Sequence, residues 1–260
     1  MTAGLFNATL SGEILNQVSE AVAVVSLFDI IFSLLLLALM IGLALQIFRE
    51  TSKIYSFMEY EGLRYFKNTF LFYGLANFFL WALDLLVLLA KSSTDASLYL
   101  LAIGMIPLFI LAGICFWFAK VNLLSAISWK MVEGTLGKRF HKFLYFIFLM
   151  FLTLMDTLVY IFILIFVGEY YAFSYKAFIF VFILLLIRSN MRSGGETKSI
   201  THPYYLGLIL LFTLSFLGNI STLLEGKSAE LISSAFDFFT LIAYVTILKG
   251  IRKWSRILLK

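Results

Sequence analysis

Long apolar stretches alternate with short polar ones along the whole chain. Most apolar stretches reach about 20 residues, roughly the length that a helix needs to cross ~30 Å of hydrocarbon. Open sheet edges cannot face lipid, so the stretches are expected to be helices. The pattern therefore predicts an all-α, polytopic integral membrane protein with seven transmembrane helices. We place the spans at about 21–47, 68–90, 97–119, 143–167, 171–189, 204–224 and 229–248.

The polar stretches between the spans are short, and none has the length of a soluble domain. The sequence therefore predicts a single seven-helix transmembrane domain over 1–260. Two of these stretches, 48–67 and 120–142, mix aromatic and basic residues. Two interpretations stay open for them: they extend the neighbouring helices, or they lie in the membrane interface.

The C-terminal stretch 249–260 is amphipathic. Ile251, Trp254 and Leu258 recur at helical spacing, with Lys253 and Arg256 between them. Such a pattern favours a helix in the headgroup layer, where basic residues attract anionic lipids. We predict an interfacial C-terminal tail in contact with anionic lipids at the cytoplasmic face.

Composition supports the membrane interpretation. Hydrophobic residues make up 62% of the chain and charged residues only 13%, against about 25% charged in soluble domains. A surface so poor in charge requires lipid as its outer solvent. The net charge of +5 follows the membrane topology, so we expect no nucleic-acid partner.

The distribution of Lys and Arg predicts the orientation. Seventeen of the 20 basic residues fall in 48–67, 120–142, 188–203 and 249–260, which alternate spans would place on one side. Cytoplasmic loops carry the excess of basic residues. We therefore predict a multi-pass protein of a cell membrane with its N-terminus outside and its C-terminus in the cytoplasm. The outer segments carry six acidic residues, and a weakly negative outer face attracts cations.

Four aspartates lie inside the apolar spans: Asp29, Asp84, Asp156 and Asp237. A charge at the bilayer centre costs about 2.5–3.5 kcal/mol on insertion scales, and such residues commonly mark ion or ligand paths. At ~1.5 Å per residue, three of them are expected roughly 9–13 Å below the outer boundary. Asp156 is expected near the midplane. The alternative is that protonated carboxyls join helices by hydrogen bonds.

Other polar residues align with these aspartates at helical spacing. Asn77 lies on the face of Asp84, and Thr153, Thr157 and Tyr160 accompany Asp156. Asn219 lies on a polar face of the sixth span. The stripes predict a polar interior, with ordinary hydrogen bonding between helices as the alternative.

Lys176 lies about five residues inside the fifth span. Snorkelling toward the interface is the favoured interpretation, and pairing with an acid is the alternative. The candidate ligand- or ion-binding residues are Asp29, Asp84, Asp156, Asp237, Asn77, Asn219 and Lys176.

Several function classes lack their signatures. The single cysteine, Cys115, allows no internal disulfide, and no motif indicates a catalytic residue, a metal site or a cofactor. The seventh span lacks the lysine of microbial rhodopsins, and no Gly-x-Gly-Asp of intramembrane aspartyl proteases occurs. An enzyme is therefore the least favoured class.

Three functions remain in order. The first is a translocator of a small solute, cation or proton, with an outward-facing acidic polar cavity. The second is a seven-helix sensor or receptor-like module that signals through a separate cytosolic partner. The third is a structural subunit of a membrane complex, in which the aspartates join helices.

Overall fold

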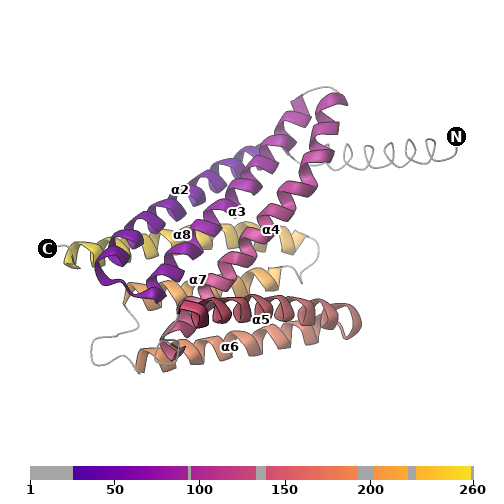
Figure 1. Cartoon of the computed structure of the whole chain (residues 1–260). Coiled ribbons are helices and arrows are strands. Elements are labelled where there is room, and N and C mark those ends of the chain that lie inside the picture. The colour runs from indigo at the N-terminus through magenta and orange to yellow at the C-terminus, as the bar shows by residue number, and fades with distance from the viewer. Residues whose placement is uncertain (1–25, 93–94, 133–138, 193–201, 222–226, 259–260) are drawn as a thin grey trace. The chain divides into compact units, whose positions relative to one another are not determined.

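The computed structural model describes residues 26–92, 95–132, 139–192, 202–221 and 227–258. Secondary structure within these ranges is entirely helical (Figure 1). The helices in chain order are α2 (Leu27–Met58), α3 (Glu61–Ser92), α4 (Asp95–Val132), α5 (Arg139–Phe166), α6 (Glu169–Arg192), α7 (Pro203–Ser221) and α8 (Lys227–Leu258). The all-α prediction is confirmed for the described part of the chain.

Each of the seven predicted spans overlaps a different helix. Five stretches within the described residues are long and apolar enough to cross a membrane: Leu27–Met58, Glu61–Lys91, Ile103–Trp129, Lys142–Phe166 and Glu169–Ser189. The described apolar stretch of α7 is shorter, at Pro203–Leu214. These helices are consistent with a multi-pass membrane protein. The count of seven spans and the orientation stay predictions.

The helices are longer than the predicted spans. The stretch 48–67 continues α2 as far as Met58 and begins α3 at Glu61. The stretch 120–142 likewise extends α4 as far as Val132 and contains the start of α5, with 133–138 outside the described residues. Helix extension is therefore the correct interpretation for the described parts of both stretches.

The turns between helices are tight where the structure describes them. Gly168 ends α5 with φ 112°, and its N–H donates to the Ile163 carbonyl at 2.9 Å. Only glycine adopts such a conformation at little cost. Glu59 ends α2 with φ 48°, so a residue with a side chain occupies the left-handed region there. Two consecutive helices, α5 and α6, thus form an antiparallel hairpin.

Two compact units divide the chain, one of residues 1–42 and 73–116, the other of 43–72 and 117–260. The boundaries fall inside α2, α3 and α4, so each of these helices contributes to both units. A single transmembrane domain over 1–260 therefore stays a prediction.

In the second unit, α5, α6, α7 and α8 pack in succession. Gly207 permits a close approach on α7, because a Cβ there would lie 2.7 Å from Cζ of Phe66 on α3. Ile247 of α8 lies on the other side, at 3.7 Å. Phe66 and Ile247 are both buried to 1% exposure. The interior of this unit is thus apolar and tightly filled.

The C-terminal part of α8 is packed against protein on one face. Ile251 is 1% exposed, and the Trp254 ring lies edge-on to the His202 ring with centroids 4.5 Å apart. The predicted tail is therefore the end of α8, and the prediction that Ile251 faces lipid is wrong. It is covered because α8 continues past the membrane core alongside the start of α7.

Large apolar side chains cover the outer faces of the long helices. Exposed examples on α5 and α6 are Phe148, Phe151, Phe162, Ile165, Phe178 and Phe182. A water-soluble surface rarely presents apolar patches of this extent. Lipid is the solvent that fits these faces.

Candidate functional site

An ion pair joins the two helices of the α5–α6 hairpin. Nζ of Lys176 lies 2.8 Å from Oδ2 of Asp156, with side chains 8% and 25% exposed. The Tyr175 hydroxyl donates to Oδ1 of the same carboxyl group at 2.9 Å. Asp156 thus receives a donor on each oxygen.

The pair lies at membrane depth if the hairpin spans the bilayer. Asp156 precedes the end of α5 at Phe166 by ten residues, which is about 15 Å along a helix. Lys176 follows the start of α6 at Glu169 by seven residues, or about 10 Å. Both positions are well inside ~30 Å of hydrocarbon.

Aromatic rings enclose the Lys176 ammonium. Nζ lies 4.7 Å from the ring centroid of Tyr160 and 5.5 Å from that of Tyr175. A desolvated cation over a ring face gains about 2 kcal/mol. These contacts hold the ammonium in the hairpin, so the favoured prediction of outward snorkelling is wrong and the alternative of pairing with an acid is correct. Asp156 offers a closer partner than the interface does.

A second lysine lies near this pair. Lys120 of α4 is half-buried and interacts electrostatically with both Lys176 and Asp156. Together with Tyr160 and Tyr175 these residues form what we call the hairpin charge cluster: Lys120, Asp156, Tyr160, Tyr175 and Lys176. It carries two basic groups for one acid, which sequence spacing within single helices did not reveal.

The polar stripe predicted on α5 is partly used in this region. The Trp117 Nε1 group donates to Oγ1 of Thr153 at 2.9 Å and so links α4 to α5. Thr157 donates within its own helix, to the Thr153 carbonyl. Sequence analysis missed Trp117 because nothing in an apolar span marks which indole finds a partner.

Asp84 lies in the first unit, where the Ser33 hydroxyl of α2 donates to its Oδ2 at 2.6 Å. Asn77, two turns earlier on α3, is buried at 6% exposure. Asp29 is exposed, although it precedes Ser33 by one turn. Ser33 and Asp84 are therefore brought together, and Asp29 is not part of that contact.

Asp237 is half-buried on α8, in the second unit. No hydrogen bond or ion pair joins it to another residue whose side chain the structure describes. The backbone of Asn219 belongs to α7, and its side chain lies outside the described residues. Convergence of Asp29, Asp84 and Asp237 at one level stays a prediction, as does ligand or ion binding by any of the seven candidates.

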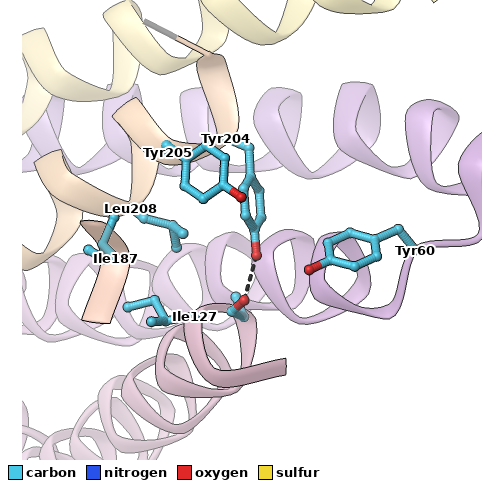
Figure 2. A pocket seen from close by; sticks show the side chains of 7 residues that line it. Tyr60, Ile127, Ile187, Tyr204, Tyr205 and Leu208 are labelled. Carbon is cyan, nitrogen blue, oxygen red and sulfur yellow. Dashed lines mark hydrogen bonds between the residues drawn. The ribbon is translucent and has the colours of Figure 1, made fainter. Parts of the chain in front are cut away.

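A third polar feature lies at the start of α7. The buried Tyr204 hydroxyl donates to the Ala126 carbonyl of α4 at 2.5 Å (Figure 2). Tyr60, Tyr205, Ile127, Ile187 and Leu208 surround this contact. The side chains leave no space for a water molecule. This cluster therefore joins helices and offers no room for a ligand.

No protein-family model, curated protein or solved structure matches this chain.

Proposed function

We propose that this membrane protein translocates a small solute, a cation or a proton, and that the hairpin charge cluster is its charged centre. The observation that carries the proposal is the ion pair between Asp156 and Lys176, buried between two helices with lipid-compatible outer faces. Ionisable residues at membrane depth commonly mark ion, proton or substrate paths.

The cost of such a pair supports a functional interpretation. Two charges lose their hydration on burial, and apolar residues of similar volume often stabilise a protein equally well or better. A chain that needed only to hold α5 to α6 has cheaper means, as the many apolar contacts of the other helices show. Retention of the charged pair is accounted for if its opening does work.

In the proposed mechanism, a proton or cation competes with Lys176 for Oδ2 of Asp156. Either one neutralises the carboxylate, so its arrival frees the ammonium and weakens the link between α5 and α6. Departure toward the other side restores the pair. The cluster then has two arrangements whose populations the transported species shifts. Asp29, Asp84 and Asp237 supply further carboxylates toward the outer ends of their helices in the predicted topology.

Flux through oriented proteoliposomes tests the proposal. Proton and monovalent-cation fluxes are recorded under an imposed gradient for the wild type, Asp156→Asn and the uncharged double variant Asp156→Leu/Lys176→Met. We expect wild-type flux and at least a tenfold loss in both variants. Ser174→Ala is the matched control, because Ser174 lies on α6 near Lys176, is exposed and bonds only the Tyr170 carbonyl of its own helix.

The structural-subunit function has one observation in its favour, since the same ion pair also fastens α5 to α6. The double variant separates the two. If it folds and its flux equals that of the wild type, the pair is a fastening and translocation through it is wrong. Absence of flux in every protein, with a partner that co-purifies under mild solubilisation, favours the subunit or sensor function instead.

A further inference from the structure

The end of α8 carries a row of basic side chains on its outer face. Lys249, Arg252, Lys253 and Arg256 are all exposed. Their spacing of three, four and seven residues places them on one side of a helix. We call this set the α8 basic face.

The opposite side of this segment is held against protein, which fixes the direction of the basic face. Ile251 and Ser255 are 1% and 5% exposed. A Cβ on Gly250 would lie 3.2 Å from Cβ of Pro203, so the two helices are in close contact there. The segment is therefore an anchored end of α8, and its charges point away from the protein.

These charges lack acidic partners. Among the described residues, no ion pair includes a member of the α8 basic face, and Arg252 donates to a neutral amide, Oε1 of Gln46, at 2.9 Å. Other basic residues contrast with them: Lys53 pairs with Glu50, and Arg64 pairs with Glu61. The α8 basic face is thus free to attract an external anion.

The surroundings specify which anion. Ile257 is 65% exposed and follows Lys253 by one turn, so an apolar side chain stands beside the charges. Apolar and basic residues side by side match the boundary between acyl chains and headgroups. A soluble anion gains nothing from the exposed isoleucine, whereas a lipid engages both.

We propose that the α8 basic face binds the headgroups of anionic phospholipids in the leaflet that the end of α8 reaches. The lipid phosphates neutralise the basic side chains, and Ile257 contacts the upper part of the acyl chains. The proposal rests on the membrane placement of the chain and is independent of translocation, so either can fail alone.

Lipid selection by the purified full-length protein tests this inference. The protein is reconstituted in phosphatidylcholine bilayers with spin-labelled phosphatidylglycerol or spin-labelled phosphatidylcholine, and the motionally restricted fraction of each is measured. We expect selection for phosphatidylglycerol in the wild type. A basic residue near an anionic surface contributes about a fivefold preference, so Lys249→Gln/Lys253→Gln/Arg256→Gln should lose at least about fivefold.

The matched controls separate this site from general charge. Lys53→Gln/Arg64→Gln removes basic residues that already have acidic partners and should keep the selection, as should the charge-preserving Lys249→Arg/Lys253→Arg. High salt should weaken selection in the unmodified protein, because exposed charges are screened. Equal retention of both lipids by the wild type, or undiminished selection in a folded triple variant, overturns the proposal. Abolition of selection by inorganic phosphate at the same ionic strength shows a soluble-anion site and also overturns it.

Discussion

The Ser33 hydroxyl of α2 donates a 2.6 Å hydrogen bond to Oδ2 of Asp84 on α3, across 51 residues of sequence. Hydrogen bonds between membrane helices average about 0.6 kcal/mol and reach about 1.7 kcal/mol. We expect Ser33→Ala to lower the free energy of unfolding by an amount in this range. A double-mutant cycle with Asp84→Ala, followed by unfolding in mixed micelles, should show coupling of the same size.

Asp29 provides the control for this cycle. It lies one turn before Ser33 on α2 and is exposed. The effects of Asp29→Ala and Asp84→Ala on the free energy of unfolding should therefore add. Additive effects of Ser33→Ala and Asp84→Ala would instead show that their hydrogen bond contributes no stability.

Single neutralisation of the hairpin pair should destabilise the protein. Lys176→Met leaves the Asp156 carboxylate with only the Tyr175 donor, and loss of one partner from a buried pair costs about 3–5 kcal/mol. The cost should fall toward the lower limit because Asp156 is 25% exposed. Thermal unfolding in detergent measures it.

Removal of both charges should recover most of that loss. Asp156→Leu/Lys176→Met leaves no buried charge without a partner, so its midpoint of unfolding should approach that of the wild type. A double variant no more stable than Lys176→Met would mean that the apolar replacements do not fit between α5 and α6.

A methyl group at Gly207 should not be tolerated. The added Cβ would lie 2.7 Å from Cζ of Phe66. That ring is buried between Phe70 and Tyr204, with centroids 5.3 Å from each, and cannot move aside easily. Overpacking costs about 1–3 kcal/mol, so Gly207→Ala should lower the unfolding midpoint.

Gly113 is the matched position in another apolar helix. A Cβ there meets no atom within 4 Å. Because alanine favours a helix over glycine by up to about 1 kcal/mol, Gly113→Ala should be neutral or slightly stabilising. Equal losses at the two positions would show that the space around the added methyl group does not decide the effect.

Accessibility of introduced cysteines should reveal the predicted topology. Glu59 lies between α2 and α3, and Glu169 begins α6, so three helices separate them. If each helix spans, the two positions lie on opposite sides. In a Cys115→Ala background, a membrane-impermeant maleimide should label Glu169→Cys in intact cells and Glu59→Cys only after permeabilisation. Labelling of both in intact cells would contradict the predicted topology.

The order of amino acids by itself determined the helical class and the approximate position of every helix in the described part. Apolar length predicts a membrane helix because the hydrocarbon core imposes a minimum span and demands that each helix satisfy its own backbone. The polar stretches around Glu59 and Arg139 were ambiguous by the same reasoning, since helix extension and interfacial helices require similar side chains.

Tertiary structure alone decided the partners of the polar residues. Helical spacing places Asp156 and Tyr160 on one face, but it cannot show that Lys176 of the next helix lies 2.8 Å from that carboxylate. Likewise, the periodicity of Ile251 and Trp254 indicates an apolar face without showing whether lipid or protein covers it. Packing between helices depends on side-chain shapes that are distant in sequence, so residue patterns within one helix predict a buried face and leave its neighbour open.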